Sequence, residues 1–176
     1  MIIKVVLFGS ESTGKTTLAQ QLAAHYHTVW VPEYSRIYQE EKKRELTLAD
    51  VIPIVLGQMQ LEEKALPKAN KLLICDTDLL ETKVYSVAYN GSCPRWLLEQ
   101  IPRHLADLYL LASIDLPWEP DGIRDRPDNR TEMHAFFHRE LLNQKVPFTI
   151  ISGNFEERLK KAIKAIDTFL LTHTLT

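Results

Sequence analysis

Short apolar runs recur along the chain, and each has the length of a β-strand. Most of them lack the alternation of apolar and polar residues that a half-exposed strand shows, which indicates strands covered on both faces. The runs occupy residues 2–8, 28–31, 71–75, 108–112 and 148–151. Between them, apolar residues recur three or four positions apart, the spacing of one face of an α-helix. Helices are therefore predicted over residues 15–27, 48–69, 131–143 and 155–171.

This alternation of strands and helices predicts an α/β protein with a mostly parallel sheet and helices on both faces. The length of 176 residues, of which 45% are hydrophobic, suits a single domain over residues 1–176. The formal net charge of −2 argues against a basic surface for nucleic acid. We also expect a cytoplasmic protein that does not bind membranes, because no window approaches 18 uninterrupted apolar residues.

Residues 115–130 differ in composition from the rest of the chain. They contain three prolines, four aspartates and three arginines with little periodicity. A long connection of this kind in a compact domain is usually a binding element or disordered. We interpret the segment as a lid.

The stretch GSESTGKT at residues 9–16 directly follows the first predicted strand and opens the first predicted helix. It matches the P-loop pattern, in which backbone N–H groups surround phosphates, a lysine reaches the β and γ phosphates and a hydroxyl binds magnesium. A three-layer P-loop NTPase fold with strand order 2-3-1-4-5 follows as the expected fold class. The predicted ATP-binding residues are Gly9, Glu11, Ser12, Thr13, Gly14, Lys15, Thr16 and Thr17.

Two acids follow the third predicted strand. Asp76 ends that strand, where a P-loop protein places a second magnesium ligand, so Thr16 and Asp76 are the predicted Mg²⁺ ligands. Asp78 lies on the same side of an extended chain and is a candidate for the same site. For either acid, capping of the next helix is the alternative.

A third group of candidates follows the second predicted strand. Glu33 is a carboxylate at a strand end, the position that a general base beside a substrate hydroxyl requires. Tyr34 is a candidate for stacking on a planar base, although packing in the core explains this tyrosine equally well. Glu33, Tyr34, Asp76, Asp78 and Trp118 are the predicted substrate-binding residues.

The lid contributes the remaining candidates. Arg124 and Arg130 are placed to neutralise charge on a transferring phosphoryl group, with a solvated loop as the alternative. Trp118 either anchors the lid or contacts a flat ligand.

The chain resembles the ribosylnicotinamide kinase domain of NadR-type proteins of NAD biosynthesis. The resemblance rests on FGSESTGKTTL at 8–18, EYSRIY at 33–38, DTD at 76–78 and PWEPDGIR at 117–124. It implies ATP- and Mg²⁺-dependent phosphorylation of the 5′-hydroxyl of nicotinamide riboside, with Lys15, Glu33, Asp78, Arg124 and Arg130 as catalytic residues.

The sequence leaves two questions open. Either Glu33 or Asp78 accepts the proton of the 5′-hydroxyl, since both are expected in one cleft. The acceptor is either this riboside or, as in related kinases, a deoxynucleoside or nucleotide. A regulatory module that hydrolyses ATP slowly is the alternative from another functional class.

Overall fold

The computed structural model describes residues 2–117 and 129–173. Its centre is a parallel sheet of five strands in the order β2-β3-β1-β4-β5. The strands are β1 (Ile3–Phe8), β2 (Val29–Val31), β3 (Leu72–Asp76), β4 (Leu108–Ala112) and β5 (Phe148–Ile151). The predicted fold class and strand order are confirmed.

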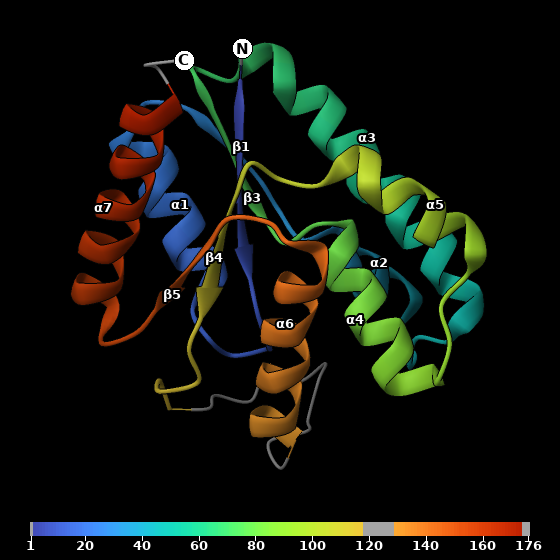
Figure 1. Cartoon of the computed structure of the whole chain (residues 1–176). Coiled ribbons are helices and arrows are strands. Elements are labelled where there is room, and N and C mark those ends of the chain that lie inside the picture. The colour runs from blue at the N-terminus through green and yellow to red at the C-terminus, as the bar shows by residue number, and fades with distance from the viewer. Residues whose placement is uncertain (1, 118–128, 174–176) are drawn as a thin grey trace.

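Helices cover both faces of the sheet, as Figure 1 shows. One face carries α1 (Lys15–His25) and α7 (Phe155–His173). The other carries α3 (Val51–Ala65), α4 (Leu79–Asn90), α5 (Arg95–His104) and α6 (Arg130–Gln144). The helix α2 (Tyr34–Lys42) packs on α3 beside this second layer.

The central strands supply both layers with core residues, which explains their continuous apolar runs. In β1, Val6 and Phe8 pack in the layer of α3 to α6, whereas Val5 and Leu7 pack under α1 and α7. All four side chains are fully buried. Alternate residues therefore face opposite apolar layers, and neither set is polar.

The helices differ from the expected ones in two respects. The helix predicted over 48–69 is divided into a 3₁₀ turn (Leu48–Asp50), α3 and a second 3₁₀ turn (Leu66–Lys68), with Thr47 and Asp50 forming a capping box at its start. The helices α2, α4 and α5 were not predicted. For α4 the signal was present, because Asp78 caps its first turn and Gly91 ends it at a φ of 67°.

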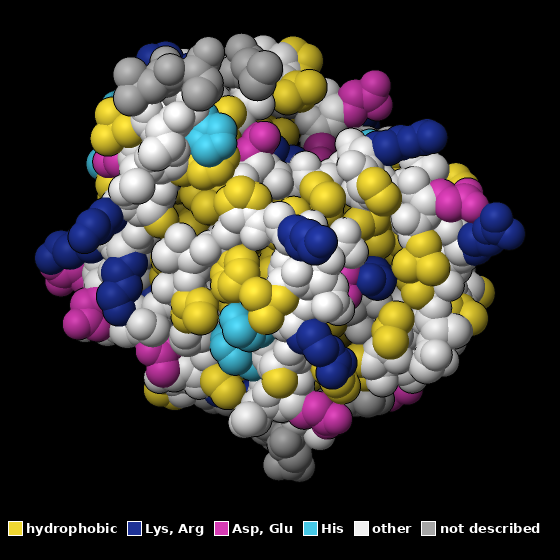
Figure 2. Space-filling view, in the orientation of Figure 1, with side chains coloured by type: hydrophobic (Ala, Val, Ile, Leu, Met, Phe, Trp, Pro, Cys, Tyr) yellow, Lys and Arg dark blue, Asp and Glu magenta, His cyan; other side chains and the backbone are white. Residues whose placement is uncertain are grey.

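The surface carries charges of both signs. On the face shown in Figure 2, lysines and arginines stand as separate groups among apolar and acidic side chains. Among the helices of the described ranges, none has the length and apolar composition that a membrane crossing requires.

Candidate active site

The segment between β1 and α1 forms a loop that both of its motif glycines make possible. Gly9 has a φ of 131°, and a Cβ there would lie 3.1 Å from the carbonyl oxygen of Ala112. Gly14 has a φ of 76°, and a Cβ there would lie 3.1 Å from the ring of Phe155 and 3.2 Å from Leu116. Any other residue at either position would strain the backbone and crowd its neighbours.

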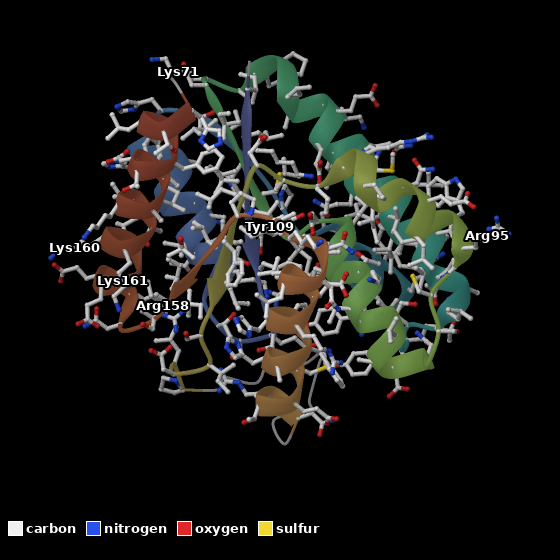
Figure 3. The ribbon with its side chains drawn as sticks, viewed as in Figure 1. Lys71, Arg95, Tyr109, Arg158, Lys160 and Lys161 are labelled. Carbon is white, nitrogen blue, oxygen red and sulfur yellow. The ribbon has the colours of Figure 1, made fainter. Side chains whose placement is uncertain are left out.

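Two arginines hold this loop from outside. Arg130, at the start of α6, donates to the carbonyl of Ser12 over 3.2 Å. Arg158 of α7 donates to the carbonyl of Thr13 over 3.2 Å and is almost completely buried. Figure 3 shows Arg158 near the first turns of α7, at the end of the sheet where the loop lies. Because these carbonyls point outward, the loop can direct N–H groups inward, as phosphate binding requires.

Lys15 is the first residue of α1, and its ammonium group is folded back over the loop. The Nζ atom donates to the carbonyl oxygens of Gly9 (2.6 Å) and Ser10 (2.9 Å). It also lies 3.5 Å from a carboxylate oxygen of Glu81, and the side chains of Lys15 and Glu81 are 7% and 3% exposed. Glu81 was not among the predicted site residues.

Asp76 and Thr16 come together beneath the loop, as predicted. The Thr16 hydroxyl donates to Oδ2 of Asp76 over 2.5 Å. Burial, and then the nearby charge of Glu33, raise the pKa of Asp76 from 3.8 to about 6. The other oxygen of Asp76, Oδ1, is buried and has no hydrogen-bond partner among the residues that the structure describes. A carboxylate held in this state suits a cation, because a cation would satisfy the buried oxygen.

The donor set also fits Mg²⁺ in particular. Within residues 2–117 and 129–173, no three His, Cys, Asp or Glu side chains gather into a metal-ligating group. Mg²⁺ in phosphate-transfer sites commonly takes one or two protein oxygens and completes its shell with phosphate and water. Thr16 and Asp76 match that requirement.

The loop lines one side of a cavity of about 240 Å³. Every predicted ATP-binding residue from Glu11 to Thr17 contributes to this lining. Three apolar residues from other segments complete its far side: Leu116, Pro117 and Phe155. Leu116 and Pro117 belong to the segment interpreted as a lid, whereas Phe155 was not identified from the sequence, because no local pattern links it to the loop.

A second cavity, of about 430 Å³, adjoins the first. Its described lining contains four glutamates and no lysine or arginine: Glu11, Glu33, Glu45 and Glu81. Tyr85 and Tyr89 of α4 also line it, with their rings stacked at 5.5 Å between centroids. These tyrosines lie four residues apart on a helix that was not predicted, so they were not identified from the sequence.

Glu33 lies where the two cavities meet, since it lines both of them. It precedes the first turn of α2, and its carboxylate accepts a hydrogen bond from the hydroxyl of Ser35. Glu33 is also close enough to Asp76 to affect the pKa of that residue. The structure therefore brings Glu33, Asp76, Thr16 and Lys15 to one place.

Asp78 takes a different position from the expected one. Thr77 has a φ of 72°, so the chain is not extended there and the side chain of Asp78 turns away from Asp76. Oδ1 of Asp78 accepts from the N–H groups of Leu80 and Glu81, and Oδ2 accepts from the Tyr109 hydroxyl over 2.7 Å. Tyr109 lies in the core between the sheet and α6 (Figure 3). The helix-capping alternative thus describes the observed contacts of Asp78.

Tyr34 and the lid residues are the remaining predicted site residues. The Tyr34 ring packs against α3 at Gly57, where a Cβ would lie only 1.9 Å from a ring carbon. Neither cavity has Tyr34 in its described lining. Arg130 reaches the loop, as described above, whereas Trp118, Arg124 and most of the lid lie outside the described residues.

Comparison with known proteins identifies the family. The model of the AAA_28 family, an AAA domain, matches residues 4–158. The trifunctional NAD biosynthesis/regulator protein NadR of Escherichia coli (strain K12) is 32% identical over 92% of this chain, and the match spans 41% of that protein. The corresponding protein of Salmonella typhimurium is 32% identical over 68% of this chain and is matched over 30% of its length. The chain thus spans less than half of these relatives.

Solved structures agree with this assignment. A NadR protein in complex with NR superposes with a TM-score of 0.80 and 26% identity, covering 96% of this chain and 51% of the other. The complex of NadR with NAD and AMP-PNP gives a TM-score of 0.78 at the same identity. Thymidylate kinase from Ehrlichia chaffeensis, at 15% identity and a TM-score of 0.69, shares the fold over 93% of this chain and 98% of its own. The chain therefore belongs to the AAA_28 family and is a P-loop domain of the kinase type, similar to the ribosylnicotinamide kinase domain of NadR.

Proposed function

We propose that the protein transfers the γ-phosphoryl group of ATP to the 5′-hydroxyl of nicotinamide riboside. ATP would bind with its phosphates in the loop of residues 9–16, facing the smaller cavity. The riboside would occupy the larger cavity, with its hydroxyl directed toward Glu33. NadR structures in complex with NR and with NAD and AMP-PNP support a riboside acceptor and an ATP donor.

The charge of the larger cavity is the observation that carries this choice of acceptor. Four glutamates and two stacked tyrosines line it, and its described lining has no lysine or arginine. A nucleoside monophosphate would place two negative charges among these carboxylates, which like-charge repulsion disfavours. Nicotinamide riboside instead carries a positively charged, planar ring. Such a ring is attracted by carboxylates and by the faces of aromatic side chains.

The site residues divide the reaction between them. Glu33 would accept the proton of the 5′-hydroxyl as the oxygen attacks, because it lies at the junction of the two cavities. Lys15 would stabilise the negative charge on the transferring group. Thr16 and Asp76 would hold Mg²⁺, which neutralises phosphate charge when bound. Asp78 is not assigned the proton, because its oxygens are buried and already accept hydrogen bonds.

The apolar side of the smaller cavity suits the base of the nucleotide. Phe155 is 51% exposed and lies beside the loop at Gly14, where Leu116 and Pro117 also contribute. An exposed aromatic ring at such a place offers a flat surface to a purine.

A panel of acceptors tests the proposal. ADP release and the phosphorylated product would be measured for nicotinamide riboside, thymidine, deoxycytidine and thymidine monophosphate. We expect stoichiometric ADP and a phosphorylated product with nicotinamide riboside. Preference for the monophosphate would indicate a nucleotide kinase, and ADP release without an acceptor would indicate an ATPase.

The role of the acceptor's charge can be tested separately. The reduced riboside, with a 1,4-dihydropyridine ring, has nearly the same shape but no positive charge. We expect kcat/KM for it to be about tenfold lower, since one favourable charge interaction at the cavity wall is lost. Equal kcat/KM values for the two ribosides would contradict the electrostatic part of the proposal.

Substitution of Glu33 tests the proton-accepting role. Glu33→Gln preserves the shape of the side chain but removes its basicity, so we expect kcat to fall by about two orders of magnitude. The affinity for ATP should change little. Glu45→Gln is the matched control, because Glu45 lines the same cavity on an exposed segment. An equal loss of kcat in both variants would mean that Glu33 acts only through general electrostatics.

A further inference from the structure

Glu81 is a buried acid at the base of the phosphate-binding loop, with no role assigned in the reaction above. It lies in the first turn of α4 and is 2% exposed. One carboxylate oxygen accepts from the N–H of Gly9 over 3.3 Å, and the other lies 3.5 Å from Nζ of Lys15. The carboxylate thus contacts both the first residue of the loop and its lysine.

The contacts of Lys15 show what a nucleotide must replace. Its ammonium group donates to the carbonyls of Gly9 and Ser10 and forms a longer ion pair, at 3.5 Å, with the carboxylate of Glu81. A phosphate that draws Lys15 toward itself must compete with these oxygens. Of the three partners, only Glu81 is an acid, and an ionised carboxylate attracts an ammonium group more strongly than a neutral carbonyl does in a poorly solvated site.

The position of Glu81 gives it a second effect. It also lines the larger cavity, which adjoins the cavity along the phosphate-binding loop. A carboxylate in a poorly solvated position repels a nearby phosphate more strongly than an exposed one does. Both effects oppose nucleotide binding.

We propose that Glu81 is a positioning residue that acts as a resident anion of the P-loop. It holds Lys15 against the loop in the nucleotide-free protein and competes with nucleotide phosphates for that ammonium group, which lowers the affinity for ADP and ATP. The inference rests on the nucleotide-binding part of the proposed function. It makes no assumption about the acceptor.

The opposite expectation would hold if Glu81 only supported the loop. In that case its loss would disorder the loop and weaken nucleotide binding. The sign of the change in affinity therefore separates a resident anion from a structural support.

The variant Glu81→Gln tests this sign. The amide oxygen of glutamine can still accept from the N–H of Gly9, while the negative charge beside Lys15 is removed. Isothermal titration calorimetry with ADP and with AMP-PNP, in the presence of Mg²⁺, would give the dissociation constants. We expect both nucleotides to bind about tenfold more tightly to the variant than to the parent protein. Unchanged or weaker binding would overturn the proposal.

Glu140→Gln is the matched control. Glu140 is also a poorly exposed glutamate, and it forms an ion pair of 2.5 Å with Lys83 of α4. Its substitution removes the same charge from a paired site that does not line either cavity. We expect its nucleotide affinity to stay within about twofold of the parent value. Equal tightening in both variants would reduce the effect to net charge and overturn the proposal.

A second variant keeps the test decisive if Glu81→Gln does not fold. Glu81→Asp retains the charge but withdraws it by one methylene, and the resident-anion role predicts nucleotide affinity within about threefold of the parent. A loss of tenfold or more would show that Glu81 supports the loop instead. Failure of the parent protein itself to bind ADP would contradict the proposed function, and it is distinguishable from failure of the variants alone.

Discussion

Replacing Lys15 with methionine should lower kcat for phosphoryl transfer by about three orders of magnitude or more. Methionine has similar length and fills the same buried space without a charge. The negative charge that spreads over the transferring group would then lose its nearest cationic partner on the loop. The KM for the acceptor should change much less than kcat, because the larger cavity is lined by other residues.

The same substitution should also lower the free energy of unfolding, by about 3 kcal/mol. Lys15 and Glu81 are both nearly buried, and methionine would leave the carboxylate of Glu81 without its cationic partner. The double variant Lys15→Met/Glu81→Gln separates the two effects. We expect it to recover most of the lost stability in chemical denaturation and none of the lost kcat. Recovery of kcat would mean that Lys15 serves the fold and not the transfer of the phosphoryl group.

Much of the fold could be predicted because its signals are local. The central strands contribute to two apolar layers, so Val5 to Phe8 form a continuous apolar run and not an alternating one. The phosphate-binding loop was equally accessible, because Gly9, Gly14 and Lys15 act within eight consecutive residues. The expected meeting of Thr16 and Asp76 required only that parallel strands end at the same edge of the sheet.

The remaining site residues depend on contacts between segments far apart in the sequence. Arg158 of α7 donates to the carbonyl of Thr13, and no sequence pattern near either residue indicates that contact. The contact of Glu81 with Gly9 depends on the position of α4, whose first turn lies next to the loop. For Asp78 the sequence offered both a site role and a helix cap, and the positive φ of Thr77 accompanies the cap contacts that the structure shows.

The arrangement also shows how acids can serve opposite purposes within one site. Glu33 and Asp76 lie close enough for one charge to affect the other. Glu33 lines the smaller cavity, and so does Thr16, which donates to Asp76. Glu81, in contrast, already has Lys15 as an ion-pair partner. In the proposed reaction, bound Mg²⁺ would relieve the repulsion between Glu33 and Asp76. Phosphate binding would instead draw Lys15 away from Glu81.

Replacing Asp76 with asparagine should abolish most of the activity, lowering kcat/KM for ATP by about three orders of magnitude, because the proposed cation loses the carboxylate assigned to it. Unlike the loss of Lys15, this change should stabilise the fold. Burial and the charge of Glu33 raise the pKa of Asp76 from 3.8 to about 6, so the folded protein disfavours the ionised form that prevails at pH 7. Asparagine can still accept the hydrogen bond from Thr16 and carries no charge.

The difference in stability between the parent protein and Asp76→Asn should depend on pH. A carboxyl group whose pKa is raised by folding contributes its full stability below about pH 4, and loses that contribution as the pH rises through about 6. At pH 7, where the parent protein has an ionised Asp76, we therefore expect Asp76→Asn to be more stable by about 3 kcal/mol. At pH 4 the difference should nearly vanish. Denaturation curves of both proteins in urea at the two pH values, without added Mg²⁺, would measure it.

The same ionisation should appear in the kinetics of the parent protein. Because the proposed cation site needs the carboxylate, kcat/KM for ATP should fall as the pH drops through about 6, whereas protonation makes the empty site more stable. Activity and stability should thus respond in opposite directions over one pH range. If Asp76→Asn gained no stability at pH 7, or lost stability there, the folded protein would not disfavour the ionised carboxylate of Asp76. The assignment of Asp76 as a magnesium ligand would then lose its physical basis.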